Sequence, residues 1–190
     1  MSAIPKRKLT PEEYLEFERK TEIKHEYLKG EIFTISGANR KHNLINANLN
    51  GLIWQHLKNK DFEAYVNRMR VFISQRGLCT YPDLVVVGGE PEFQDDVFDT
   101  LLNPILLIEV LSESTESYDR GKKFQHYRSI ESLQEYILVA QDEARVEKYV
   151  KQGDGFWVLS EAVGLETEIE FSSIDQRIAL REIYDKIEFE

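Results

Sequence analysis

The run Pro104–Leu111 constrains the fold of this chain most strongly, because it is almost wholly apolar and yet contains one acid, Glu109. A run rich in Ile, Leu and Val that opens with proline is typical of a β-strand buried on both faces. Side chains alternate along a strand, so Glu109 shares a face with Ile105, Leu107 and Leu111. An ionised carboxylate among leucines is costly unless it meets a cation, a metal or a donor network. Glu109 is therefore the first candidate functional residue.

The composition narrows the classes of protein. With 190 residues, the chain is expected to form one domain over residues 1–190. Cys79 is the only cysteine, which argues against a disulfide framework and a cysteine-based zinc cluster. No apolar run approaches the roughly 18 residues of a membrane span, so we expect a soluble, cytoplasmic protein without membrane partners. The net charge of −10 disfavours nonspecific coating of nucleic acid but not a nuclease with clustered basic residues or bound metal.

The first part of the chain carries clear helix and hairpin signals. A capping box predicts a helix from Pro11 to about Arg19, and residues 24–28 and 31–35 predict a hairpin. Glu26 in this hairpin is interpreted as a solvent-facing strand residue.

Apolar residues recur at helical spacing from His42 to about Lys58, which predicts the longest helix, and its opposite side carries Asn43, Asn46 and Asn50. His42 can touch an anion or ligate a metal, but a surface histidine in a capping region is the preferred interpretation.

Strands are expected at residues 62–66, 71–74 and 83–87, followed by a solvated acidic connection over 90–103. A calcium loop is the alternative for these acids, but the spacing and glycine of an EF-hand are absent. Toward the C-terminus we expect strands at 134–140, 144–151 and 156–159 and a short closing helix at 178–184.

The strand over 83–87 supplies a partner for Glu109. If it pairs antiparallel with the apolar run, the register that places Val87 opposite Ile105 places Asp83 opposite Glu109. Opposed Cβ atoms lie about 4.5–5.5 Å apart, so both carboxylates can bind one ion, and a divalent metal relieves their repulsion. Magnesium, with manganese as a substitute, suits this sparse set of oxygen ligands better than zinc. A register slip of one residue would separate the two acids.

The residues after Leu111 predict a helix over 119–129, whose apolar side carries Phe124 and Tyr127. Lys123 lies about 70° from the middle of that side, whereas Lys122 points nearly opposite it. Lys123 can thus reach inward toward the buried acid. A surface ion pair with the aspartate four residues earlier is the alternative interpretation.

Together these residues resemble the Uma-two family of restriction endonuclease-like proteins, within the PD-(D/E)XK nuclease superfamily. The motifs that carry the resemblance are Glu26 in a strand hairpin, Pro82-Asp83, Glu109-Val-Leu-Ser112, and Asp119, Lys123 and Tyr127. The resemblance covers roughly residues 10–184. It implies an α/β (α+β) class and a restriction-endonuclease-like fold, with a central mixed β-sheet flanked by helices.

The resemblance also implies a metal-dependent endonuclease, a phosphodiester hydrolase that acts on nucleic acid. Asp83 and Glu109 would bind magnesium, the backbone carbonyl of Val110 could add an oxygen ligand, and Glu26 would be an outer or second-metal acid. Lys123 would orient the attacking water or screen the developing charge.

The chain departs from the superfamily at Leu111, which stands where the lysine of Glu-x-Lys is expected, so the lysine is expected to come from the following helix. DNA is the expected substrate, and a homodimer is expected because two sites cut two strands most simply. One alternative is a catalytically inactive nucleic-acid-binding protein of the same fold. The other is an acidic oligomeric interaction protein in which Asp83 and Glu109 share a proton.

Overall fold

The computed structural model of the chain describes residues 8–35, 37–66 and 68–189, so residues 1–7, 36, 67 and 190 of the expected domain lie outside the described residues. The helices are α1 (Pro11–Glu18), α2 (Arg40–Leu57), α3 (Glu116–Tyr118), α4 (Phe124–Tyr127) and α5 (Leu180–Ile183), with 3₁₀ turns η1 (Ser74–Arg76) and η3 (Ser172–Ile174) and a π-helical turn η2 (Asp119–Lys123). The strands are β1 (His25–Leu28), β2 (Glu31–Thr34), β3 (Phe62–Val66), β4 (Arg70–Ile73), β5 (Leu78–Thr80), β6 (Leu84–Gly88), β7 (Thr100–Leu101), β8 (Leu106–Val110), β9 (Glu135–Val139), β10 (Arg145–Lys151), β11 (Trp157–Val163), β12 (Glu168–Phe171) and β13 (Gln176–Ala179). Within these described ranges, no helix has both the length and the apolar character needed to cross a membrane.

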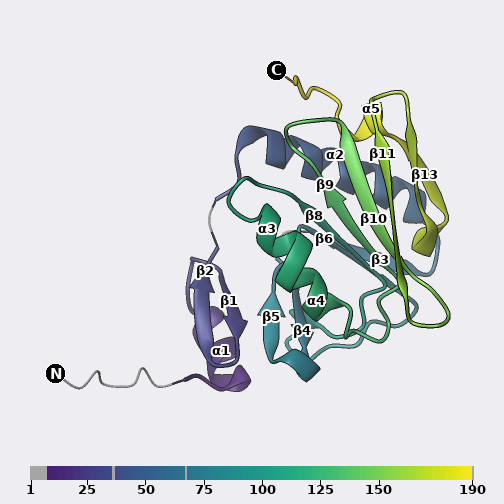
Figure 1. Cartoon of the computed structure of the whole chain (residues 1–190). Coiled ribbons are helices and arrows are strands. Elements are labelled where there is room, and N and C mark those ends of the chain that lie inside the picture. Colours follow the sequence, from purple (N-terminus) through teal and green to yellow (C-terminus); the bar gives the residue numbers. More distant parts are fainter. Residues whose placement is uncertain (1–7, 36, 67, 190) are drawn as a thin grey trace.

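A six-stranded mixed sheet forms the centre of the fold, in the order β11-β10-β9-β8-β6-β3. β8 and β9 are parallel, and the other neighbours are antiparallel. Helix α2 lies against one face of the sheet, and the segment α3–η2–α4 lies against the other (Figure 1). Ile45 and Leu49 of α2 belong to the core on the first face, and Phe124 and Tyr127 to the core on the second. The expected mixed sheet flanked by helices is confirmed.

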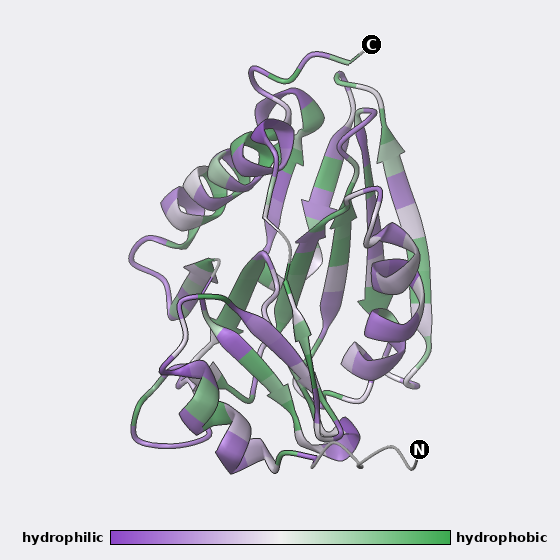
Figure 2. Cartoon of the chain, turned by 90° about the vertical axis from the view of Figure 1, so that its left-hand side faces the viewer, coloured by the Kyte–Doolittle hydropathy of each residue, from purple (hydrophilic) through white to green (hydrophobic). Residues whose placement is uncertain are grey.

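A second sheet, in the order β2-β1-β5-β4-β7, is packed beside α1. The predicted capping box is present, since Thr10 Oγ1 accepts from the Glu13 N–H at 3.2 Å and Glu13 Oε2 accepts from the Thr10 N–H at 2.9 Å. The predicted hairpin is also present, and Lys29 and Gly30 turn its chain at positive φ. Figure 2 shows hydrophobic stretches along the central strands and hydrophilic positions along the helices that cover them.

β6 and β8 pair in the predicted antiparallel register. Leu84 lies opposite Ile108, and Val86 lies opposite Leu106. The next position in the same register brings Asp83 opposite Glu109, just beyond the end of the ladder. Because β8 is flanked by β6 and β9, Glu109 lies on a central strand of the sheet.

Two predicted helices have the wrong bounds. The helix expected over 119–129 begins at Glu116, ends at Tyr127 and contains the π-helical turn Asp119–Lys123. The helix expected over 178–184 is limited to Leu180–Ile183, because Ile178 pairs with Ile169 in the β12–β13 hairpin.

The acidic connection over 90–103 is not simply solvated. Arg19 forms ion pairs with Asp95 and Asp99, each at 2.8 Å, and Asp99 also pairs with the buried Arg70. A short strand, β7, continues this segment and pairs with β4. The connection therefore fixes α1 to the second sheet.

Candidate active site

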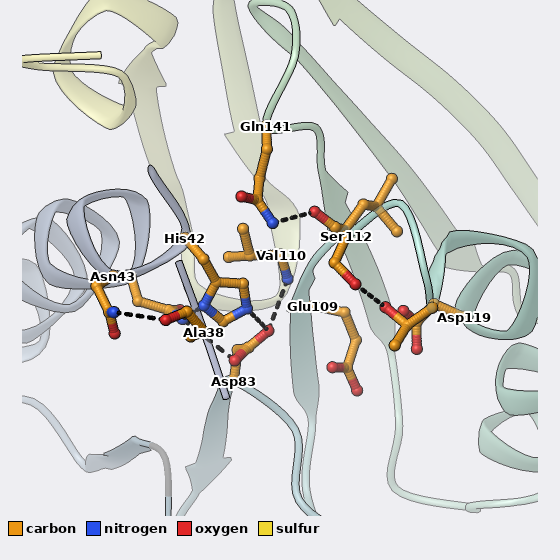
Figure 3. A network of polar contacts seen from close by, with 12 residues as sticks. Ala38, His42, Asn43, Asp83, Glu109, Val110, Ser112, Asp119 and Gln141 are labelled. Carbon is orange, nitrogen blue, oxygen red and sulfur yellow. Dashed lines mark hydrogen bonds and ion pairs between the residues drawn. The ribbon is translucent and has the colours of Figure 1, made fainter. Parts of the chain in front are cut away.

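Asp83 immediately precedes β6, and the register of the sheet places it opposite Glu109 of β8. Figure 3 shows both side chains between His42 on one side and Asp119 on the other. These flanking residues belong to α2 and to η2, the two helical segments that cover opposite faces of the sheet. The site is thus built where the two helical layers approach the central strands.

Three donors hold the carboxylate of Asp83. The backbone N–H of Val110 donates to Oδ2 at 2.8 Å, the side-chain amide of Asn46 donates to Oδ1 at 3.1 Å, and His42 Nε2 lies 3.2 Å from Oδ2. Burial alone would raise the pKa of Asp83, but the bonds from His42 and Val110 outweigh burial and lower it below its ordinary value. Asp83 is therefore held as a carboxylate with a fixed orientation.

Glu109 has the opposite environment. Its side chain lies within the core, with only 4% of the residue exposed. Lys123 Nζ lies 2.9 Å from Oε1, and the Tyr127 hydroxyl donates to the same oxygen at 2.8 Å. Burial raises the pKa of Glu109 to about 8 against the attraction of Lys123, and the charges of Asp119 and Asp83 add to this rise.

Lys123 is buried, with 6% of the residue exposed, whereas its neighbour Lys122 is exposed, as the helical-wheel argument predicts. Besides Glu109, its ammonium contacts Asp119 at 3.3 Å and Glu26 at 3.5 Å. Burial alone would lower the pKa of Lys123, but the surrounding acids, Glu109 first, outweigh burial and raise it well above its ordinary value. Lys123 is thus a buried, charged donor to Glu109.

Glu26 does not face solvent as the hairpin pattern suggested. Its Oε1 accepts a hydrogen bond from the Thr80 hydroxyl and forms the ion pair with Lys123. The side chain is 17% exposed because β1 lies next to β5, which carries Thr80. Glu26 therefore holds Lys123, and its predicted role as an outer metal ligand stays a prediction.

Leu111 is buried in the same core cluster as Phe124 and Tyr127. Its side chain contributes to packing, and the ammonium that contacts Glu109 comes from Lys123 of η2. The carbonyl of Leu111 accepts a hydrogen bond from the side-chain amide of Gln141, which fixes the chain after β8.

The interpretation of His42 as a surface histidine is wrong. Its side chain is 15% exposed and contacts Asp83, and the buried Asn46, one turn further along α2, contacts the same carboxylate. The one sequence signal for this pair is the spacing of four residues, which places both side chains on the same side of the helix. The sequence pattern places Asn46 on the polar side of α2, so the contact between Asn46 and Asp83 was not predicted.

Comparison with known proteins assigns the chain to a family. The family model described as "Uma2: Putative restriction endonuclease" matches residues 11–180. The chain belongs to the Uma2 family. The predicted resemblance is therefore confirmed.

Two curated proteins of Synechocystis sp. (strain ATCC 27184 / PCC 6803 / Kazusa) resemble this Uma2 chain. The uncharacterized protein sll1609 is 42% identical over 164 residues, which cover 86% of this chain and 93% of that protein. The uncharacterized protein slr1290 is 35% identical over 187 residues, which cover 98% of this chain and 97% of that protein. The similarity thus extends over nearly the whole length of each protein.

A solved structure shares the fold of this Uma2 chain. It is described as a "putative nuclease belonging to DUF820" from Anabaena variabilis ATCC 29413, with a TM-score of 0.78 and 19% sequence identity. The match covers 95% of this chain and 99% of that chain. At this identity the likeness bears on the fold alone, and it agrees with the predicted restriction-endonuclease-like architecture.

The donor set of the Uma2 site consists of carboxylate oxygens, which are ligands of hard cations such as magnesium. In the part of the chain that the structure describes, no group of three or more His, Cys, Asp or Glu side chains is arranged to hold a metal. The two neighbouring carboxylates of Asp83 and Glu109 repel each other, and a divalent cation would offset this repulsion. Magnesium takes one or two protein carboxylates and keeps several waters.

Proposed function

We propose that this Uma2 chain is a magnesium-dependent nuclease that hydrolyses phosphodiester bonds, with DNA as its substrate. The observation that carries the proposal is that Asp83, which immediately precedes β6, lies beside the buried pair of Glu109 from β8 and Lys123 from η2, so that three charged side chains form one polar cluster against an apolar core. Burying such charges carries a large desolvation penalty, which their mutual attraction offsets only in part, so the cluster is not explained by stability. A catalytic role accounts for it.

The carboxylates of Asp83 and Glu109 would hold magnesium or manganese, and the carbonyl of Val110 could contribute a further oxygen. When bound, the metal lowers the pKa of a coordinated water and offsets the charge of the phosphate. The three donors to Asp83 keep its carboxylate ionised and oriented. The protein therefore supplies one preformed ligand in Asp83 and a second, Glu109, that must lose its proton.

Lys123 supplies the positive charge of the site. Its ammonium is fixed by Glu109, Asp119 and Glu26, so it does not need to be ordered when the substrate arrives. From this position it orients the attacking water or stabilises the negative charge that develops on the phosphate. Lys123 thus takes the role that Leu111 cannot perform.

We extend the proposal to a homodimer, because two copies of one site cut the two strands of a duplex most simply. This extension is independent of the chemistry at each site.

The proposal is tested by incubating the purified protein with plasmid, single-stranded DNA and RNA, with magnesium or with a chelator. The wild type should cleave DNA only with the metal. Asp83→Ala and Glu109→Ala should lose this cleavage while they retain cooperative unfolding, because they remove metal ligands. Lys123→Ala should lose about 10²–10³-fold in rate, the magnitude typical of losing one electrostatic stabiliser.

Lys122→Ala is the matched control, because Lys122 is the exposed neighbour of Lys123, and it should cleave at the wild-type rate. Full cleavage by Asp83→Ala or Glu109→Ala would overturn the site. Binding of nucleic acid without cleavage by the wild type would instead identify a binding protein of the same fold.

A further inference from the structure

We infer that His42 and Asn46 are positioning residues that orient Asp83 for metal binding. The inference rests on the proposed function and deepens it. The first turn of α2 brings His42 to Oδ2 of Asp83, and the next turn brings Asn46 to Oδ1. Both oxygens of this carboxylate are thereby held by one helix.

The three side chains form a closed ring of polar contacts. The Asn46 amide nitrogen lies 3.1 Å from Asp83 Oδ1 and 3.2 Å from His42 Nδ1, so its two hydrogens have two acceptors. The nitrogen must face Asp83, because the amide oxygen would be repelled by the carboxylate. His42 Nδ1 is then the acceptor, so the hydrogen of the neutral ring is on Nε2, which lies 3.2 Å from Asp83 Oδ2. The ring therefore fixes both the amide orientation and the imidazole tautomer.

A buried asparagine such as Asn46 destabilises the fold more than an apolar residue at the same position would. It is 7% exposed, and its Oδ1 is buried without a hydrogen-bond partner among the described residues. A buried polar atom without a partner destabilises the folded protein. The neighbouring inward positions of α2, Ile45 and Leu49, are apolar and fully buried. An apolar side chain would fill the same space without this cost, so the amide nitrogen that binds Asp83 explains why asparagine stands here.

The two candidate ligands are held from opposite sides of the site. Asp83 is held by His42 and Asn46 from α2, and Glu109 is held by Lys123 and Tyr127 from η2 and α4. Figure 3 shows His42 beside Asp83 on the side away from Asp119. The docking of α2 thereby sets one ligand relative to the other, which is the arrangement that supports the ligands of metal sites in general.

The test compares His42→Ala, Asn46→Ala and His42→Gln by calorimetric titration with magnesium and manganese, by the separate values of kcat and KM for DNA cleavage, and by chemical denaturation. The alanine variants should bind metal about 10–100-fold more weakly and lose kcat, with KM for DNA little changed. His42→Gln should recover most of the affinity, because its amide nitrogen can donate to Oδ2 in place of Nε2.

His56→Ala is the matched control. His56 lies on the same helix and bonds to the carbonyl of Ile174, away from the site. Its substitution should lower the stability of the protein and leave the metal affinity unchanged. Unchanged metal affinity in His42→Ala and Asn46→Ala, beside a wild type that binds metal, overturns the inference and leaves the proposed function standing. An equal loss in His42→Gln and His42→Ala also overturns it, since packing rather than a donor would then matter. A wild type that binds neither metal overturns both.

Discussion

At the scale of single residues, the site holds two carboxylates whose environments shift their pKa values in opposite directions. Asp83 accepts bonds from three donors, which lower its pKa. Glu109 lies deeper, and burial raises its pKa to about 8 even beside Lys123. Asp83 is thus ionised near neutral pH, whereas the ionisation of Glu109 depends on the charges that lie beside it.

The raised pKa of Glu109 predicts a pH-dependent stability. Without metal, the folded state keeps the proton of Glu109 from its ordinary pKa of 4.5 up to about 8, whereas the unfolded state loses it. The contribution of Glu109 to the free energy of unfolding is therefore present below pH 4.5 and is lost as the pH rises toward 8, by at most about 1.4 kcal/mol per pH unit. Glu109→Gln should have a flatter profile than the wild type in denaturant titrations with a chelator across this range. A variant profile parallel to that of the wild type would contradict the prediction.

The residues that sequence patterns could identify are those with local signals. Glu109 interrupts an apolar run, and Lys123 lies beside the apolar side of its own helix. The bond between Asn46 and Asp83 joins residues 37 positions apart, so no local pattern marks it. His42 was accordingly assigned to the surface, although the fold buries most of its side chain against Asp83.

Among the helices and strands, the π-helical turn η2 could not be predicted from the sequence, because the angle calculated for Lys123 assumes a regular α-helix. A π-helical turn locally widens the helix and often occurs at functional sites. Here it contains both Asp119 and Lys123, which are buried and bonded to each other at 3.3 Å. The inward direction of Lys123 could still be predicted, because Phe124 and Tyr127 lie in the regular turn that follows.

The elements that the sequence revealed are those with strong end signals. The capping box marked α1, and Lys29-Gly30 marked the first hairpin. The β12–β13 hairpin was missed because its short strands mix charged and apolar residues, and because they are stabilised mainly by pairing with each other. Such pairing is set by tertiary context rather than by local preference.

The ion pairs of Asp99 predict how strongly the acidic connection holds α1. Burial would raise the pKa of Asp99, but the bonds from Arg19 and Arg70 outweigh burial and lower it. Its contribution to stability is therefore present above the ordinary pKa of 3.8 and is lost as the pH falls through the lower folded value. Asp99→Asn should destabilise the protein by about 1–3 kcal/mol at pH 7, and its difference from the wild type should shrink below pH 3.8.

Chemical denaturation at pH 7 and pH 3 measures this difference, and Asp96→Asn, an exposed position in the same connection, should have little effect at either pH. A loss in Asp99→Asn that is equally large at both values would show that its ion pairs are not the cause.

At the scale of the whole molecule, the net charge of −10 means that overall attraction cannot bring nucleic acid to the site. Local cations lie near it instead. The ammonium of Lys24 lies over the ring of Tyr81, 5.2 Å from the ring centre. Tyr81 is two residues before Asp83 in the chain. Burial and the nearby charge of Arg68 lower the pKa of Lys24, and the charge of Asp83 opposes them. Lys24 thus lies within the field of Asp83, and Lys123 pairs with Glu109, Asp119 and Glu26.

Asp83 and Glu109 are proposed to hold one divalent metal ion together. The most direct measurement is a crystal structure of the protein with manganese, in which anomalous scattering locates the ion. We expect one strong peak within about 2.0–2.6 Å of a carboxylate oxygen of each residue, with Lys123 still beside Glu109. A fully occupied manganese site elsewhere, or saturating manganese with no peak between these carboxylates, would contradict it.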